Sequence, residues 1–212
     1  MDVIVAGGHG KVGIKLLERL AVRGDRARGL IRNPDHAADL EAVGAQAVVV
    51  DLETEDPTPH LLDATAIVFA AGAGPGSGEE RKRTVDYGAC VKLLESAQAL
   101  GIPRFVVVSS MGADAPEGGS DTMRPYLQAK ADADAAVRAS GLAWTVVRPG
   151  HLTDAPAHGR VVVAERLGFG GSISRDDVAD VLVAVLDTPT AEGAVFEVLE
   201  GDVPVVSAVA GL

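Results

Sequence analysis

Tyr126 and Lys130 are the residues whose types and spacing point most directly to chemistry. They lie four residues apart in a segment predicted to be helical, and this spacing places both side chains on one face. A neighbouring ammonium favours phenolate and lowers a tyrosine pKa from about 10 toward the working range. Such a tyrosine can give a proton to a carbonyl oxygen as a hydride reaches the carbon, or take one in the reverse reaction. The alternative is an ordinary pair on the surface of a helix.

Two adjacent serines, Ser109 and Ser110, end an apolar segment that lies one predicted element before this helix. A hydroxyl at this place can orient the oxygen atom of a substrate while the tyrosine exchanges its proton. We therefore predict four catalytic positions, which are Ser109, Ser110, Tyr126 and Lys130.

Three glycines, Gly7, Gly10 and Gly13, lie between a short apolar run and an amphipathic helical pattern. A strand, a glycine turn and a helix start in this order form a cradle for a diphosphate. The backbone can approach the anion closely there, and the first N–H groups of the helix face it. A tight turn without a ligand is the alternative. The predicted contacts to the diphosphate of a dinucleotide are Gly7, Gly8, His9, Gly10, Lys11, Val12 and Gly13.

The residues after the second predicted strand indicate which dinucleotide is bound. In this arrangement an acidic residue usually binds both ribose hydroxyls of NAD. This chain has Arg32 and then Asn33, and a guanidinium can bind a 2′-phosphate through two hydrogen bonds. We therefore expect NADP rather than NAD, with an exposed surface arginine as the alternative. Asp51 and Leu52, after the third strand, are predicted to meet the adenine amino group unless Asp51 is simply a turn residue.

Strand-like and helix-like segments alternate along the whole chain. Apolar strands separated by helices indicate a parallel sheet covered on both faces, and right-handed crossovers then give a doubly wound α/β fold. Ligands of such folds bind at the carboxyl ends of the strands. We expect one domain, residues 1–212, in which residues 151–212 form a small cap over the cofactor. The predicted strands are 3–6, 27–31, 47–50, 66–70, 105–109, 144–148 and 195–199, and the main predicted helices are 11–23, 35–43, 80–100, 125–140 and 174–186.

The net charge of −11 argues against a nucleic-acid-binding protein, which needs a basic surface to displace counterions from phosphates. No apolar run reaches the roughly 18 residues of a membrane helix, and the N-terminus lacks a signal-peptide pattern. The single cysteine, Cys90, rules out an internal disulfide and suits a reducing cytoplasm. Its spacing to the histidines matches no metal site, so we expect no metal.

The chain contains five motifs in a recognisable order: Gly7-Gly8-x-Gly10-x-x-Gly13, Arg32-Asn33-Pro34, Val107-Val108-Ser109-Ser110, Tyr126-x-x-x-Lys130 and Arg148-Pro149-Gly150. This series resembles the short-chain dehydrogenases/reductases, which have a Rossmann fold. The doubled glycine, the short chain and the Arg-Pro-Gly tract look like the atypical branch of that family. That branch includes NmrA-like NAD(P)H-binding proteins and the biliverdin/flavin reductase type.

The resemblance implies that Ser109 or Ser110 acts together with Tyr126 and Lys130. It also implies a cofactor contact from Asp86, and Lys130 can in addition bond the ribose hydroxyls beside the nicotinamide. The remaining implied cofactor contacts are Ala70, Ala71, Gly72, Ser109, Pro149, Gly150, His151 and Leu152.

The chain departs from the family pattern at two places. His9 replaces the usual small hydroxyl residue of the glycine turn, where it can reach a phosphate or face solvent. The asparagine that the typical branch carries in its fourth helix has no clear counterpart near residues 85–90, which puts a complete proton relay in doubt. His151 offers a second proton donor or is an ordinary loop residue.

We expect an NADP-dependent oxidoreductase for a small carbonyl, alcohol or conjugated ring compound. The glycine-rich loops 72–80, 112–124 and 151–172 accept many shapes and do not identify that compound. A non-catalytic NADP(H)-binding redox sensor is the alternative, because members of the atypical branch often lack the tyrosine. A nucleotide-sugar epimerase or dehydratase ranks third, because the segment left after the sixth strand, residues 151–212, has only 62 residues. We expect a cytoplasmic monomer or homodimer without nucleic-acid or membrane partners.

Overall fold

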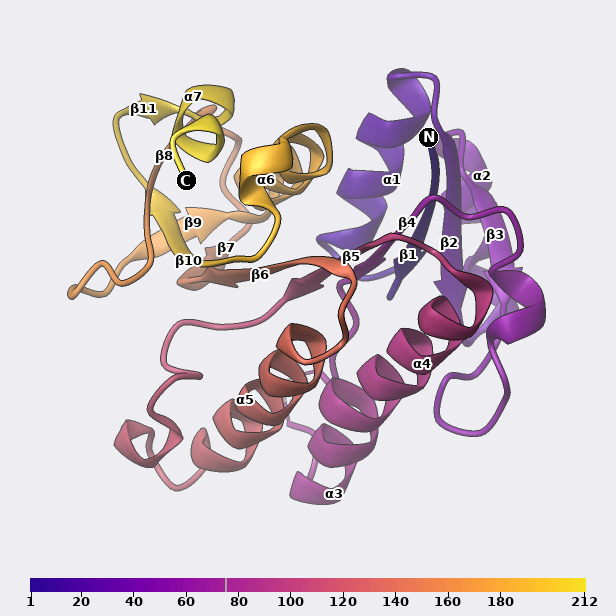
Figure 1. Cartoon of the computed structure of the whole chain (residues 1–212), viewed down its shortest axis with the longest axis horizontal. Coiled ribbons are helices and arrows are strands. Elements are labelled where there is room, and N and C mark those ends of the chain that lie inside the picture. The colour runs from indigo at the N-terminus through magenta and orange to yellow at the C-terminus, as the bar shows by residue number, and fades with distance from the viewer. Residues whose placement is uncertain (75) are drawn as a thin grey trace.

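A central sheet organises the computed structural model, which describes residues 1–74 and 76–212 and is shown in Figure 1. Six parallel pairings join β10 to β3 through the middle of the sheet, whereas β8 pairs antiparallel with both β10 and β11. The doubly wound α/β sheet predicted from the sequence is therefore confirmed, with an antiparallel edge at β8 that was not predicted. In spatial order the strands are β11 (Val203–Pro204), β8 (Arg160–Ala164), β10 (Ala194–Glu200), β6 (Ala143–Pro149), β5 (Arg104–Val108), β4 (Ala66–Phe69), β1 (Asp2–Ala6), β2 (Arg26–Ile31) and β3 (Gln46–Val49).

Both faces of the sheet are buried, which explains why its strands are apolar along their whole length. In β1, Val3 and Val5 belong to the core on one face, and Ile4 and Ala6 belong to the core on the other. One face is covered by α1 (Gly13–Val22), α2 (Ala37–Ala42), α6 (Arg175–Asp187) and α7 (Val205–Ala210), and the other by α4 (Cys90–Leu100) and α5 (Arg124–Arg138) (Figure 1).

The helix expected over residues 80–100 has three parts. A short helical turn, α3 (Glu79–Arg81), leads into a π-helical stretch, Lys82–Ala89, which continues as α4. In a π-helix each backbone hydrogen bond spans five residues instead of four, which widens the turn, and such stretches are frequently found at functional sites. The sequence pattern predicted this helix but not its widened turn.

The segment after β6 is the one expected to form a small cap over the cofactor. Three of its strands, β8, β10 and β11, extend the central sheet, and α6 packs against α1. A separate two-stranded sheet, β7 (His151–Thr153) with β9 (Ser172–Ser174), was missed in the sequence, as were β8, β11 and α7. The strand expected at 195–199 is β10, and it is followed by β11 and α7. A role of residues 151–212 in covering a cofactor therefore stays a prediction.

The parallel register brings the loops that follow several strands to one edge of the sheet. Ala6 pairs with Phe69, which pairs with Val107, and Val108 pairs with Val147. The chain after β3 crosses over β2 and β1 to reach β4, so the sheet has a switch point between β1 and β4, where such folds bind ligands. In the parts of the chain that the structure describes, every helix is too short or too polar to span a bilayer.

Candidate functional site

The glycine turn after β1 has a geometry that side chains would block. Gly7 has φ of 77°, and a Cβ atom there would lie 2.8 Å from Cα of Ala71. A Cβ atom on Gly13 would overlap the carbonyl oxygen of Gly7, which lets α1 begin tightly against the turn. Within residues 1–74 and 76–212, the backbone N–H groups of Lys11 and Val12 donate to no backbone carbonyl. A bare turn with free donors at a helix start fits the diphosphate of a dinucleotide.

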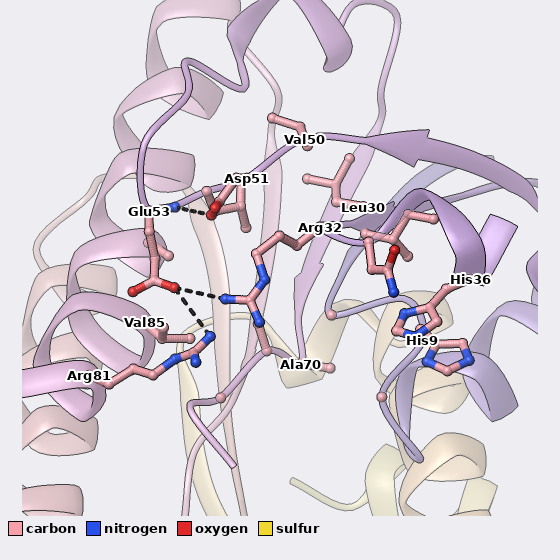
Figure 2. A pocket seen from close by; sticks show the side chains of 18 residues that line it. His9, Leu30, Arg32, His36, Val50, Asp51, Glu53, Ala70, Arg81 and Val85 are labelled. Carbon is pink, nitrogen blue, oxygen red and sulfur yellow. Dashed lines mark hydrogen bonds and ion pairs between the residues drawn. The ribbon is translucent and has the colours of Figure 1, made fainter. Parts of the chain in front are cut away.

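A cavity of about 450 Å³ extends from this turn across the ends of β2, β3 and β4 to the helix that begins at α3 (Figure 2). Ten predicted cofactor residues line it: Gly7, His9, Gly10, Arg32, Asn33, Asp51, Leu52, Ala70, Ala71 and Gly72. The sequence analysis missed eight further lining residues: Leu30, Ile31, His36, Val50, Glu53, Arg81, Val85 and Ala89. A cleft of this size beside a glycine turn can hold one half of a dinucleotide.

Arg32 meets an unexpected acid at the end of this cavity. Its Nη1 atom lies 3.2 Å from Oε2 of Glu53, and Nη2 of Arg81 lies 3.3 Å from the same oxygen. Oγ1 of Thr84 donates to the other carboxylate oxygen at 2.7 Å. Arg81 comes from a helix far along the sequence, so no local pattern linked it to Arg32. The structure thus brings two guanidinium groups together where one was predicted.

The side chains of His9 and Lys11, two other predicted cofactor contacts, interact with side chains of the protein. The His9 ring stacks on His36 with 3.6 Å between ring centroids, and its Nε2 lies 2.8 Å from Oδ2 of Asp39. The Lys11 ammonium pairs with Asp154 at 2.6 Å. Both side chains are partly exposed, so these contacts cost little to exchange for a phosphate.

Asp51 has a local structural role in the turn after β3. Its Oδ1 accepts the Glu53 N–H at 2.9 Å, and its own N–H donates to Oε2 of Glu55 at 2.6 Å. The carbonyl of Leu52 accepts from the Lys92 ammonium at 2.7 Å. Asp51 therefore matches the turn-residue alternative, although it still lines the cavity beside Leu52.

Tyr126 and Lys130 lie together near the first turns of α5. The Lys130 ammonium is 5.8 Å from the centroid of the half-buried Tyr126 ring. It donates to the Val108 carbonyl at 3.1 Å and pairs with Oδ1 of Asp86 at 3.2 Å. Burial alone would lower the pKa of Lys130, but the attractions of Tyr126 and Asp86 outweigh it and raise that pKa above its ordinary value. Lys130 is therefore a fixed cation next to the phenol.

Asp86 lies in the π-helical stretch and reaches the loop after β4. Its Oδ2 accepts the Ala73 N–H at 3.2 Å, while Oδ1 faces Lys130. A Cβ atom on Gly72 would lie 3.0 Å from that Oδ1. The predicted cofactor loop and the predicted catalytic lysine are thus joined through one carboxylate.

The two serines point to different surroundings. Ser109 is buried, and its hydroxyl donates to Oδ2 of Asp134 at 3.0 Å. Arg148 donates to the same oxygen at 2.9 and 3.0 Å. Ser110 is half-buried and its hydroxyl donates only weakly, at 3.2 Å, to the carbonyl of Met111. Ser110 is therefore the serine better placed to meet a substrate.

The segment Pro149–Leu152, whose four residues are implied cofactor contacts, leaves the end of β6 and lies outside the cavity lining. A Cβ atom on Gly150 would overlap the Leu199 side chain, so this chain must pass close to β10. The His151 N–H donates to the Gly171 carbonyl at 2.9 Å, and the His151 residue is exposed. Within the described residues, the cavity lining includes residues predicted to contact the adenosine and the diphosphate, whereas Pro149–Leu152 lie outside it.

Comparisons with known proteins agree with this fold. An uncharacterised sugar epimerase of Bacillus subtilis, YhfK, is 37% identical over 211 residues, with 98% of both chains covered. A Bacillus halodurans protein, provisionally assigned as an NAD-dependent epimerase/dehydratase, has a solved structure with TM-score 0.96 and 38% identity over 99% of both chains. The anaerobilin reductase ChuY of Escherichia coli O157:H7 shares the fold, with TM-score 0.80, 24% identity and coverage of 95% of this chain and 98% of that one.

Residues 7–189 also match the NAD(P)H-binding family, and this match starts at the first glycine of the turn. The match covers every strand from β2 to β6 and α6 as well. The solved structures that share this fold also include the oxidoreductase YlbE of Lactococcus lactis, with TM-score 0.89, 24% identity and coverage of 100% of this chain and 96% of that one. The chain belongs to the NAD(P)H-binding family of Rossmann-fold proteins.

Proposed function

We propose that this protein is an NADP(H)-dependent oxidoreductase that acts on a small carbonyl or conjugated ring compound. The observation that carries the proposal is the Lys130 ammonium 5.8 Å from the Tyr126 ring, at the sheet edge that also holds the glycine turn. A phenol beside a buried cation can act as a general acid toward a substrate oxygen, because the cation stabilises the phenolate that forms. Arg32 and Arg81 favour the 2′-phosphorylated cofactor.

Each residue of this group has a distinct part in the proposed reaction. A bound nicotinamide would supply or accept the hydride at the substrate carbon. Tyr126 would give its proton to the substrate oxygen, and the charge of Lys130 would stabilise the phenolate that remains. Ser110 would orient that oxygen through its hydroxyl, which makes only a weak bond to its neighbour. Asp86 and the Val108 carbonyl would hold the lysine in place.

The substitution Tyr126→Phe tests this proposal, and Tyr87→Phe is its matched control. Tyr87 is the other tyrosine of the chain, and the Cζ atom of Arg83 lies 5.0 Å from the centroid of its ring. NADPH oxidation is measured against a panel of aldehydes, ketones and conjugated ring compounds, and NADPH binding by calorimetry. We expect Tyr126→Phe to lower kcat by about 100-fold or more and to leave binding unchanged. Turnover equal to that of the Tyr87→Phe variant would remove the proton-donor role.

A nucleotide-sugar epimerase is a second candidate, favoured by one observation. The Bacillus subtilis relative carries the name of a sugar epimerase, and the Bacillus halodurans relative that of an epimerase/dehydratase. Against it, more than half of the residues after β6 build β8, β10, β11, α6 and α7, which leaves little chain for a second nucleotide. A thermal-shift screen with nucleotide sugars separates the two, because a specific ligand raises Tm. A large rise with a nucleotide sugar, and product epimerised at one carbon, would replace the oxidoreductase proposal.

A further inference from the structure

Glu53 occupies the junction of two arginines at one end of the cavity (Figure 2). Arg32 follows β2, Glu53 follows β3 and Arg81 ends α3, so three separate segments meet at this carboxylate. Both guanidiniums contact the same oxygen, Oε2, at 3.2 and 3.3 Å. One carboxylate between two guanidiniums resembles the arrangement in which proteins bind a phosphate group.

The two ion pairs are weak enough to exchange. The side chains of Arg32 and Arg81 are 55% and 43% exposed, and that of Glu53 is 25% exposed. Pairs with this exposure contribute little, because water already solvates both partners. The Thr84 hydroxyl holds the other Glu53 oxygen at 2.7 Å, so the acid has an anchor that does not depend on the arginines. The guanidiniums can therefore turn away while Glu53 stays bound to Thr84.

A phosphomonoester competes well for these two arginines. It carries a charge of about −1.5 to −2 at neutral pH, against −1 for a carboxylate, and it offers three acceptor oxygens. The same cavity reaches the glycine turn that fits a diphosphate, so a ligand with both groups can span it. An unphosphorylated ribose would instead offer hydroxyls, which a free Glu53 carboxylate can accept.

We propose that Glu53 is the residue that decides between the two dinucleotides. Its carboxylate pairs with Arg32 and Arg81 and so competes with the 2′-phosphate of NADP for the two guanidiniums. The same carboxylate can accept hydrogen bonds from the ribose hydroxyls of NAD. Glu53 thus weakens the preference for NADP that the arginines create, and Arg81 is a second contact to the 2′-phosphate. This inference rests on the proposed binding of a dinucleotide and does not depend on the reaction.

The test compares the dissociation constants of NADPH and NADH by calorimetry for the wild type, Glu53→Gln and Arg81→Gln. Adenosine 2′,5′-bisphosphate and adenosine 5′-monophosphate repeat the comparison with the adenosine half alone. Glu80→Gln is the matched control, because Glu80 is an exposed acid next to Arg81 in the sequence. Circular dichroism checks that each variant is folded.

We expect Glu53→Gln to shift the ratio of affinities toward NADPH by roughly 5-fold to 30-fold. The reason is twofold, since the carboxylate no longer competes with the 2′-phosphate for the arginines and no longer accepts hydrogen bonds from the ribose of NAD. Arg81→Gln should lower the affinity for NADPH and leave that for NADH nearly unchanged, and Glu80→Gln should alter neither ratio. An unchanged ratio in a folded Glu53→Gln variant, or a shift toward NADH, would overturn the inference while dinucleotide binding itself stood. Failure of the wild type to bind either dinucleotide would overturn the proposed function and this inference together.

Discussion

The ammonium of Lys130 lies 3.2 Å from Oδ1 of Asp86, and the two side chains are only 4% and 1% exposed. The lysine comes from α5 and the aspartate from the π-helical stretch before α4. Through its other oxygen, Asp86 also accepts the N–H of Ala73 in the loop after β4. A buried cation without such a partner would be strongly destabilising, so this pair allows a charged lysine to lie beside Tyr126.

The substitution Asp86→Ala should lower the free energy of unfolding by about 3–5 kcal/mol at pH 7, because it leaves Lys130 buried and unpaired. The pKa of Lys130 is raised in the folded protein, so its stabilising contribution is full at lower pH and is lost as the pH rises above 10.5. The difference between variant and wild type should therefore shrink at pH 11. Urea denaturation at both pH values measures it, with exposed Glu95→Ala as the control. A loss below about 1 kcal/mol at pH 7 would contradict this account.

The adjacent serines should affect different properties when each is replaced by alanine, one the stability of the fold and the other the turnover. Ser109→Ala removes a buried hydroxyl that donates to Asp134 at 3.0 Å and should cost about 1–3 kcal/mol of stability. Ser110→Ala should leave stability nearly unchanged and lower kcat about tenfold or more. Chemical denaturation and steady-state kinetics on both variants make the comparison. The reverse pattern would assign the substrate contact to Ser109.

Substitutions in the glycine turn should separate an effect on folding from an effect on NADPH binding. A Cβ atom on Gly13 would overlap the Gly7 carbonyl oxygen, so Gly13→Ala should cost about 3 kcal/mol. A Cβ atom on Gly10 would lie 3.0 Å from that oxygen and needs only a small shift. Gly10→Ala should therefore fold but bind NADPH at least about tenfold more weakly, because its methyl group occupies the approach of the diphosphate. Thermal unfolding and calorimetry distinguish the two effects, and unchanged NADPH affinity in Gly10→Ala would argue against the cradle.

The sequence predicted the features that depend on hydrophobic periodicity and on the order of the elements along the chain. All-apolar segments such as Val3–Ala6 indicated strands buried on both faces, and parallel pairing then placed the loops after them at one edge. The glycine turn, Arg32, Asp51 and the loop after β4 were thus expected together. Gly7 and Gly10 of the turn line the cavity with the other residues, whereas Gly13 does not. The short β7–β9 sheet was missed because segments of three residues carry little periodic signal. The antiparallel β8 was missed although its residues 161–164 are as apolar as the strands that were predicted.

The sequence could not predict which way individual side chains point. Successive residues of a strand face opposite sides, so an error of one residue in the strand end exchanges the roles of Ser109 and Ser110. The meeting of Glu53 with Arg32 and Arg81 depends on rotamers of three distant segments, and no spacing encodes it. Helical periodicity likewise does not distinguish the widened π turn around Asp86 from an α-helix.

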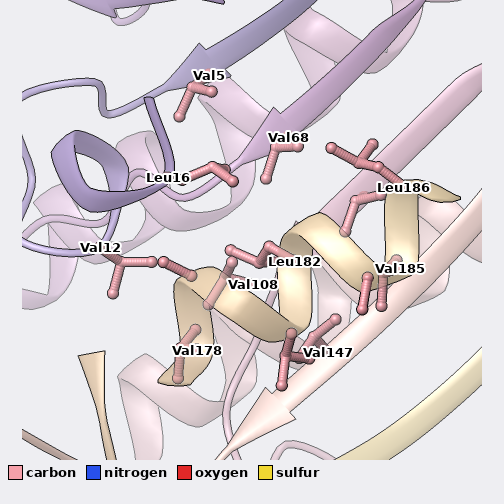
Figure 3. Close-up of a cluster of buried hydrophobic side chains, with 14 of the residues drawn as sticks. Val5, Val12, Leu16, Val68, Val108, Val147, Val178, Leu182, Val185 and Leu186 are labelled. Carbon is pink, nitrogen blue, oxygen red and sulfur yellow. The ribbon is translucent and has the colours of Figure 1, made fainter. Parts of the chain in front are cut away.

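The contact between α1 and α6 predicts how the fold responds to acid. Leu16 and Leu182 belong to one buried cluster at this contact (Figure 3), and Asp176 pairs with Lys15 and Arg19 at 2.7 and 3.1 Å. Burial would raise the pKa of Asp176, but these two cations outweigh it and lower that pKa below 3.8. Asp176 therefore stabilises the fold above pH 3.8, and this contribution is lost as the pH falls further. Asp176→Asn should cost about 1 kcal/mol at pH 6 and progressively less as the pH falls below 3.8, as urea denaturation at pH 6 and at pH 2.5 measures. A cost that is equal at both pH values would mean that packing, rather than charge, holds α6 on α1.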